Sequence, residues 1–246
     1  MAEFGDTVDR QDVERFATQS ASWWDPAGSF RPLHQINPPR LDFIRHRLLA
    51  HFGRDPLALS PFTGLSLADI GCGGGLVTEP MTRLGFSVTG IDAGAAAIEV
   101  ARSHAEENGL AITYRVGDIA ALAAAGERFD AVLALEIVEH VADRDAFFAA
   151  LGAVVKPGGA FIGATLNRTA RSFAMAIVGA EYLLHWLQPG THDWRRFVRP
   201  SEFILGLRRA RLATTAITGL GYDWRRGLWS ESDDLSVNYL LAAVRR

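Results

Sequence analysis

Two short stretches of this chain carry residue types that could do chemistry. The first places Asp69, Gly71, Gly73 and Gly75 in the pattern D-x-G-x-G-x-G, in which an acid precedes a glycine-rich turn. Glycine adopts backbone angles that are closed to residues with a Cβ, and it lets a ligand come close to the main chain. The helix expected over residues 76–84 would point its free N–H groups at that ligand. Strand, glycine turn and helix together favour a nucleotide-type cofactor at the edge of a parallel sheet.

The spacing of these glycines distinguishes between classes of cofactor. A nicotinamide fingerprint, G-x-G-x-x-G, would need glycine in place of Leu76, and a P-loop would need a Gly-Lys-Ser/Thr triplet that the sequence lacks. The carboxylate of Asp69 suits a ligand with ammonium and sulfonium charges better than it suits a pyrophosphate. Asp92 ends the next strand, at a spacing that suits hydrogen bonds from ribose hydroxyls. The alternative is that the glycines form only a tight turn and that the acids cap helices.

Glu136, Glu139 and His140 form the second stretch, directly after an apolar strand expected over 129–135. Ligands of doubly wound sheets lie outside the carboxyl ends of the strands, so these side chains are expected to face the cofactor. Two carboxylates and an imidazole can bind a hard divalent cation such as Mg²⁺. They can also take a proton from an acceptor hydroxyl, because a phenol with a pKa of about 10 is mostly neutral at pH 7. The alternative is that they merely open a loop and cap the next helix.

Alternating strands and helices must position these two stretches. After the strand that leads into the glycine turn, apolar runs predict strands over 87–91, 112–116, 129–135 and 160–165, separated by helices that include 95–108 and 145–155. This alternation indicates a Rossmann-like, doubly wound α/β sheet that is mainly parallel and covered on both faces. The Lys156–Gly159 run is expected to stop the helix before it. A helix over 200–210 and strands over 212–218 and 237–244 should follow, and the two strands should form an antiparallel pair at the sheet edge.

Two helices joined by a proline-rich loop are expected before the core. One covers about 9–22, and the other begins near Pro39 and runs to Phe52. We expect one domain over 1–246. Its parts are the N-terminal helices and lid (1–65), the cofactor-binding core (66–165), the apolar insert (166–199), and the C-terminal helix and strands (200–246).

The composition excludes several classes of protein. Among 246 residues the sequence has one cysteine, Cys72, so no internal disulfide can form, which agrees with a reducing compartment. The formal net charge of -3 argues against a nucleic-acid binder. The acidic start of the chain does not fit a secretory signal, and no apolar run reaches the ~20 residues that span a bilayer.

Several pieces of the sequence outside the glycine turn resemble those of one family. The pieces are spread over nearly the whole chain, at Phe16, Ser22–Asp25, Pro32–Arg40, Glu136–Val141, Lys156–Gly159, Thr165–Arg168, Val178–Tyr182, Gly190–Asp193, Pro200 and Val237–Tyr239. The Trp-Trp-Asp, Leu-His-x-Ile-Asn-Pro and Gly-Thr-His-Asp pieces are much more specific than the glycine turn. On these residues the chain resembles the ubiquinone biosynthesis O-methyltransferases, a family of class I S-adenosylmethionine-dependent methyltransferases.

This resemblance implies an activity, a cofactor and a set of site residues. The activity is O-methylation of two polyprenylated phenols, 2-polyprenyl-6-hydroxyphenol and 3-demethylubiquinol, with S-adenosylmethionine as the methyl donor. The family's cofactor contacts fall on Arg40, Gly71, Asp92 and Leu135, and its divalent metal site falls on Glu136, Glu139 and His140. A backbone role fits Leu135 best, because relatives often have methionine there.

The candidate site is completed by residues that the motifs suggest. We expect Asp69 and Gly73 to contact the cofactor, and Asp118 looks like the position that meets the adenine amino group in this fold. His140 and Glu139 are the candidate catalytic residues. There are two alternative functions. The protein could methylate another small phenolic acceptor, or it could be a membrane adaptor of a quinone-synthesis complex without activity of its own. An adaptor would have no use for an intact pair of carboxylates and a histidine.

Residues 173–187 are unusually apolar, with Glu181 as their only charged residue. The stretch is too short to span a membrane, but it suits an interfacial segment that meets the bilayer holding a polyprenyl substrate. The resemblance implies the same location, a cytoplasmic protein peripherally bound to the inner face of the membrane. A lid helix packed on the protein itself, or half of a dimer interface, is the alternative. Thr191, His192 and Asp193 follow and are expected to border the acceptor pocket.

Overall fold

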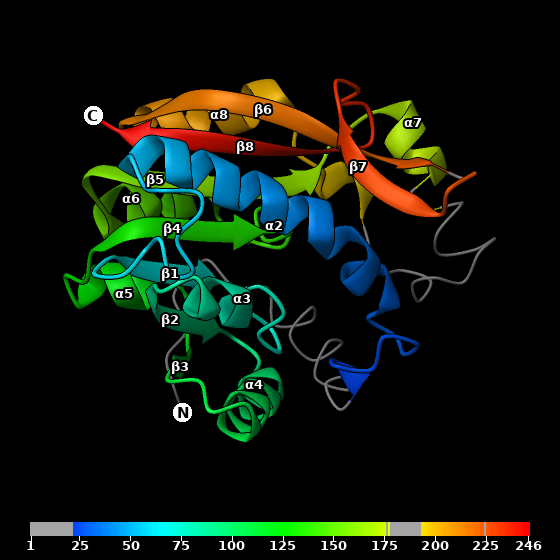
Figure 1. The fold of residues 1–246 in the computed structure, drawn as a ribbon. Helices are drawn as coiled ribbons and strands as arrows, with labels where there is room; N and C mark the ends of the chain where they lie inside the picture. The colour runs from blue at the N-terminus through cyan, green and yellow to red at the C-terminus, as the bar shows by residue number, and fades with distance from the viewer. Residues whose placement is uncertain (1–21, 176, 178–192, 224) are drawn as a thin grey trace.

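Strands near the middle of the molecule form one sheet in the computed structural model, which describes residues 22–175, 177, 193–223 and 225–246 (Figure 1). Residues 9–21 of the predicted helix over 9–22, most of the apolar segment over 173–187 and residues 190–192 lie outside the described residues. Eight strands are described, in the order β3-β2-β1-β4-β5-β8-β6-β7. Their bounds are β1 Ser66–Ile70, β2 Ser87–Asp92, β3 Thr113–Val116, β4 Phe129–Leu135, β5 Val155–Leu166, β6 Leu212–Asp223, β7 Leu228–Ser232 and β8 Asn238–Arg245.

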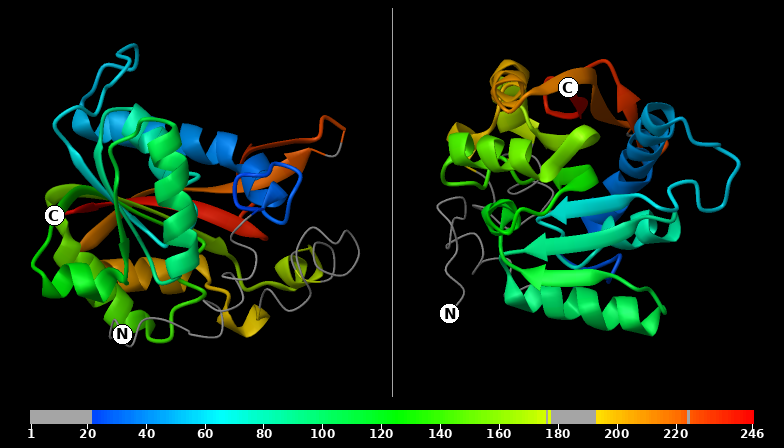
Figure 2. Two further views of the ribbon diagram at one scale, coloured as in Figure 1. Left: turned by 90° about the horizontal axis from the view of Figure 1, so that it is seen from below. Right: turned by 90° about the vertical axis from the view of Figure 1, so that its left-hand side faces the viewer.

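Helices cover both faces of this sheet (Figure 2). The described helices are α2 Arg31–Phe52, α3 Thr78–Arg83, α4 Ala95–Glu107, α5 Ile119–Ala124, α6 Arg144–Val154, α7 Ala170–Ser172, the 3-10 turn η3 Trp194–Arg196 and α8 Pro200–Arg209. Helices α2 and α3 pack on one face, and α5, α6 and α8 pack on the other. Strands β1 to β5 are parallel to one another, so the expected doubly wound α/β fold is confirmed.

The C-terminal strands extend the sheet further than the sequence predicts. Strand β8 lies between β5 and β6 and is antiparallel to both, and β6 and β8 form the expected antiparallel pair. The pair is not the edge of the sheet, however, because β7 adds to the outer side of β6. The prediction missed β7 because most of its residues are exposed or half-buried, and so it lacks the apolar run of a core strand.

Helix α2 begins earlier than expected. The sequence predicts a start near Pro39, but the helix begins at Arg31, with Pro32 in the first turn and Pro38 and Pro39 in the interior. An interior proline removes a backbone hydrogen bond and costs about 3 kcal/mol. Burial of one face of the helix, which includes Phe43, Ile44 and Leu48, offsets that cost. Arg40 therefore lies within the helix and not at its start.

Local signals set most other boundaries. Helix α6 ends at Val154, within one residue of the prediction, but Lys156–Gly159 belong to β5 and form an irregularity in its pairing with β4. Helix α5 was not predicted; Asp118 caps it by accepting a hydrogen bond from the Ala121 N–H at 3.0 Å. Among the described residues, none of the helices is long and apolar enough to cross a membrane.

Candidate active site

The predicted site residues gather at one edge of the sheet. Asp69 and Gly71 lie at the end of β1, Asp92 ends β2, and Leu135 ends β4. Strand β1 lies between β2 and β4, so the strand order reverses there. Open α/β sheets bind ligands outside the carboxyl ends of their strands at such a switch point. The topology therefore brings the acid-led turn and the residues after β4 to the two sides of one expected ligand site.

The glycine turn adopts a backbone that only glycine takes readily. Gly71, Gly73 and Gly75 have φ angles of 68°, 53° and 93°. A Cβ on Gly71 would lie 1.9 Å from a side-chain carbon of Ile137, and a Cβ on Gly73 would lie 2.0 Å from the indole of Trp23. Neighbouring side chains therefore pack directly against the bare backbone. The predicted left-handed backbone is confirmed, and the close approach of a ligand stays a prediction.

Asp92 fixes this turn through both oxygens of its carboxylate. Oδ2 accepts a hydrogen bond from the Gly73 N–H at 2.9 Å, and Oδ1 accepts one from the Gly94 N–H at 2.7 Å. Burial raises the pKa of the carboxyl, and these two bonds oppose the rise. A carboxylate oxygen has two lone pairs, so each can accept a second bond from a ribose hydroxyl.

Asp69 lies beneath the turn, and only 3% of it is exposed. Its Oδ2 accepts a hydrogen bond from the Thr78 hydroxyl at 2.6 Å, which ties β1 to the start of α3. Burial raises the pKa of Asp69 to about 7, the charge of Asp92 adds to the rise, and the bond from Thr78 opposes it. In the structure Asp69 supports the turn from below; its contact with a cofactor stays a prediction. The same holds for Asp118, whose capping of α5 is the alternative that the sequence left open.

Arg40 forms an ion pair with Glu136, a residue predicted to bind metal. Arg40 Nη2 donates to Glu136 Oε1 at 2.7 Å, and only 5% of the arginine side chain is exposed. Its Nε is buried and has no hydrogen-bond partner among the described residues. Glu136 has a φ of 55°, a left-handed backbone that costs a non-glycine residue about 1–2 kcal/mol. The guanidinium lies next to the end of β4, where a carboxylate of a ligand could be held by a charge-assisted bond.

Glu139 is the most deeply buried of the three acidic and imidazole side chains after β4. It is 2% exposed, and its Oε2 accepts a hydrogen bond from the Thr165 hydroxyl at 2.9 Å. In the part of the chain that the structure describes, no N–H or hydroxyl donor reaches its buried Oε1. Burial, together with the charge of Glu136, raises the pKa of Glu139 to about 8. A carboxyl with such a pKa can hold or release a proton near neutral pH, which general acid–base chemistry requires.

His140 is half-buried at the end of a short turn. Its backbone N–H donates to the Ile137 carbonyl at 2.8 Å, and its own carbonyl accepts from Arg196 Nη2 at 3.1 Å. The Arg196 contact joins this turn to the segment that precedes α8. His140 lies beyond the carboxyl end of β4, and its role as a base stays a prediction.

The expected magnesium site is not assembled by these residues. Among the described residues, which include Glu136, Glu139 and His140, no group of three or more His, Cys, Asp or Glu side chains is placed to hold a metal ion. The physical reason is that Glu136 is paired with Arg40 and Glu139 faces Thr165. The donor set as arranged does not fit a metal ion, and Mg²⁺ binding stays a prediction.

Two tryptophans that were not predicted as site residues cover the glycine turn. The indole of Trp23 packs on Gly73 and Gly74 and on the ring of Phe30. Trp24 Nε1 donates to the Gly74 carbonyl at 2.9 Å. Both belong to the Trp-Trp-Asp piece of the resemblance, and this was the available signal that the segment serves the site.

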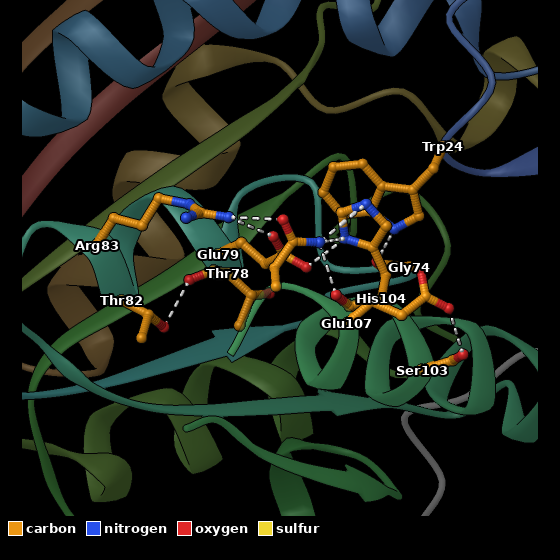
Figure 3. A network of polar contacts seen from close by, with 10 residues as sticks. Trp24, Gly74, Thr78, Glu79, Thr82, Arg83, Ser103, His104 and Glu107 are labelled. Atoms are coloured by element: carbon orange, nitrogen blue, oxygen red, sulfur yellow. Dashed lines mark hydrogen bonds and ion pairs between the residues drawn. The ribbon is translucent and has the colours of Figure 1, made fainter. Parts of the chain in front are cut away.

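Trp24 is also held from the side by a polar network (Figure 3). Its indole stacks on the imidazole of His104 in α4, with ring centroids 3.5 Å apart. His104 Nδ1 lies 2.6 Å from Oε1 of Glu79, a buried residue of α3 that Arg83 contacts at 3.3 Å. The network connects the segment before α2 to two core helices, and so holds it against the glycine turn.

Comparisons with known proteins show what this chain is similar to. Residues 68–163 match a family model described as a methyltransferase domain. A ubiquinone biosynthesis O-methyltransferase from Paramagnetospirillum magneticum is 50% identical, over 97% of this chain and 96% of its own length. A protein of the same name from Methylobacterium nodulans is 52% identical, over 98% of this chain and 97% of its own length.

Solved structures show the same fold at low sequence identity. An S-adenosylmethionine-dependent methyltransferase from Clostridium acetobutylicum has a TM-score of 0.65 at 13% identity, covering 93% of this chain and 98% of its own. Magnesium protoporphyrin IX methyltransferase from Synechocystis, solved with bound SAH, has a TM-score of 0.62 at 20% identity, covering 96% of this chain and 94% of its own. The expected Rossmann-like methyltransferase fold is confirmed.

Proposed function

Because this chain belongs to the ubiquinone biosynthesis O-methyltransferase family, it is an S-adenosylmethionine-dependent O-methyltransferase of ubiquinone biosynthesis, and we propose that its acceptors are 2-polyprenyl-6-hydroxyphenol and 3-demethylubiquinol. The observation that supports the site assignment is the convergence of the glycine turn, Asp92, Arg40 and the turn after β4 at one switch point of the sheet.

The residues at this edge divide into two groups by what they can do. Arg40 supplies a buried guanidinium for the carboxylate of the methyl donor, and Asp92 supplies carboxylate oxygens for the ribose hydroxyls. When bound, S-adenosylmethionine supplies an electrophilic methyl group on sulfur. Holding an acceptor oxygen in line with that methyl group can contribute roughly 7–11 kcal/mol of the lowering of the barrier.

His140 and Glu139 are the residues that accept the proton of the acceptor hydroxyl. A phenol with a pKa of about 10 must lose its proton as its oxygen attacks the methyl carbon. The imidazole of His140 is the side-chain type most often used as a general base, and burial together with the charge of Glu136 raises the pKa of the adjacent Glu139 to about 8. The oxygen–methyl bond forms as the sulfur–methyl bond breaks, and the proton passes to the base.

His140→Ala tests the catalytic assignment. We expect methyl transfer to a short-chain demethylubiquinol to fall by about 10²–10⁴-fold, with the affinity for S-adenosylhomocysteine retained. His51→Ala is the matched control, because His51 contacts the Gly158 carbonyl beside the start of β5, away from the glycine turn. Near-normal turnover by His140→Ala would show that His140 is not the base.

Dependence on Mg²⁺ is a separate prediction, implied by the resemblance and not used in the mechanism above. A methyl-transfer assay on both phenols, with and without a chelator, tests it. Full activity with chelator present would agree with the side-chain arrangement described here. An acceptor screen in the same assay separates the proposed substrates from other small phenols.

We propose that the protein contacts the cytoplasmic face of the membrane through residues 173–187, where its polyprenyl substrate would lie. Of the part of this segment that the structure describes, Phe173 and Met175 are 46% and 39% exposed. Large apolar side chains that protrude into water suit insertion into a bilayer surface. Liposome flotation of the chain with and without residues 173–187 tests the proposal, and equal flotation would contradict it. Binding within a quinone-synthesis complex stays a prediction.

A further inference from the structure

Asn37 is a buried polar residue to which the mechanism above gives no role. It lies in α2 and is 7% exposed, and its side-chain Oδ1 has no hydrogen-bond partner among the residues that the structure describes. Leaving a buried amide oxygen unpaired costs about 1–3 kcal/mol, so such an atom in a packed helix needs an explanation. A leucine of nearly the same shape would not carry that cost.

Arg40 has the complementary feature on the same helix. Asn37 and Arg40 are three residues apart, so their side chains lie on one face of α2, and both are buried. Arg40 Nε is a donor without a partner, whereas Asn37 Oδ1 is an acceptor without one. The two residues between them are prolines, whose side chains have no polar atoms.

The amino-acid end of the methyl donor matches this pair of groups. It carries a carboxylate, which accepts hydrogen bonds from a guanidinium, and an α-ammonium group, which donates hydrogen bonds and needs oxygen acceptors. Carboxylate and ammonium are attached to one carbon, so the two groups that bind them must converge on it, as the ends of two side chains on adjacent turns of a helix can do. Arg40 also contacts Glu136 at the end of β4, so this face of α2 borders the proposed site.

We propose that Asn37 binds the α-ammonium group of the methyl donor through Oδ1, while Arg40 binds the adjoining carboxylate. The proposal rests on the function proposed above and names a further binding residue for it. Asn37 discriminates ligands that carry the amino-acid end from those that lack it. It contributes to affinity, and therefore to the KM for the donor, and has no part in the proton transfer.

Two thioethers without the sulfonium charge provide a direct test. S-Adenosylhomocysteine has the amino-acid end, and 5′-methylthioadenosine lacks it. Calorimetric titration of Asn37→Leu should show about tenfold weaker binding of S-adenosylhomocysteine, which is about 1.4 kcal/mol, and less than twofold change for 5′-methylthioadenosine. Asn37→Asp keeps an acceptor and should bind S-adenosylhomocysteine within about threefold of the wild type.

Asn238→Leu is the matched control. Asn238 is equally buried, at 7% exposure, but its Oδ1 accepts the Leu220 N–H at 2.8 Å. This substitution should lower the melting temperature and should not change the affinity for one ligand more than the affinity for the other. If Asn37→Leu weakened both ligands equally, or neither, the proposal for Asn37 would be wrong. Failure of the wild type to bind S-adenosylhomocysteine would instead overturn the proposed function itself.

Discussion

The raised pKa of Asp69 predicts how the stability of the protein depends on pH. A carboxyl whose pKa rises on folding keeps its proton in the folded state at a pH where the unfolded chain has released it. The folded state then binds more protons, so stability falls as the pH rises from the unfolded value of 3.8 towards about 7. Asp69→Asn removes this loss, because the amide is neutral at every pH and still accepts the bond from Thr78.

The size of the effect follows from the shift. A rise in the pKa from 3.8 to about 7 corresponds to a loss of stability of roughly 4 kcal/mol at high pH. Nearly all of this loss is present at pH 8.5, and roughly 2 kcal/mol of it is present at pH 5. The difference in unfolding free energy between Asp69→Asn and the wild type should therefore widen by about 2–3 kcal/mol between these pH values, in favour of the variant. Urea unfolding followed by tryptophan fluorescence at the two pH values measures it.

Asp130 offers a control of opposite sign. Its carboxylate accepts hydrogen bonds from Lys156 and Ser66, which hold its pKa below the usual range although partial burial opposes them. Its contribution to stability is present above the unfolded pKa and is lost as the pH falls, so Asp130→Asn should cost stability at pH 7 and lose its effect in acid. A difference between Asp69→Asn and the wild type that did not change with pH would refute the reasoning about Asp69.

Two further predictions concern the tryptophans on the glycine turn. Gly73→Ala should lower the free energy of unfolding by about 2 kcal/mol more than Gly109→Ala, because both glycines have left-handed backbones but only the Cβ at 73 would meet an indole ring, at 2.0 Å. Trp24→Phe should cost about 1 kcal/mol more than Trp229→Phe, because the first removes a hydrogen bond to the turn and the second removes an N–H that has no partner. Denaturant unfolding measures each pair, and equal costs within a pair would contradict the stated contact.

The elements that the sequence predicts well are those whose signals are local. Strand β4 was predicted with its observed bounds because it is almost continuously apolar, and α4 and α8 match within one residue at each end. The start of α2 was wrong because prolines were taken as breaks, and only the tertiary packing of the buried face shows why the helix continues through Pro38 and Pro39. No sequence pattern in residues 31–39 predicts which part of the protein packs against this first part of the helix.

The candidate site was predictable as a set of residues but not as a set of contacts. The order of strands in a doubly wound fold brings Asp92, Gly73 and Glu139 to one edge, and their sequence positions suffice for that. The contacts that these side chains then form depend on residues that are distant from them in sequence. Arg40 and Glu136 are 96 positions apart, and Trp24 lies 50 positions before the glycine whose carbonyl it contacts.

Glu136 is the residue whose interpretation changes most. Its neighbours Glu139 and His140 suggest a shared metal ion, because carboxylates and an imidazole so close in sequence often have a common ligand. In the structure the left-handed backbone of Glu136 accompanies a carboxylate paired with buried Arg40. A carboxylate that neutralises a buried guanidinium cannot be withdrawn without leaving an unpaired charge, at a cost of roughly 3–5 kcal/mol. Glu136 therefore belongs with Arg40 in setting the position of the guanidinium, and the proton transfer proposed above rests on Glu139 and His140 alone.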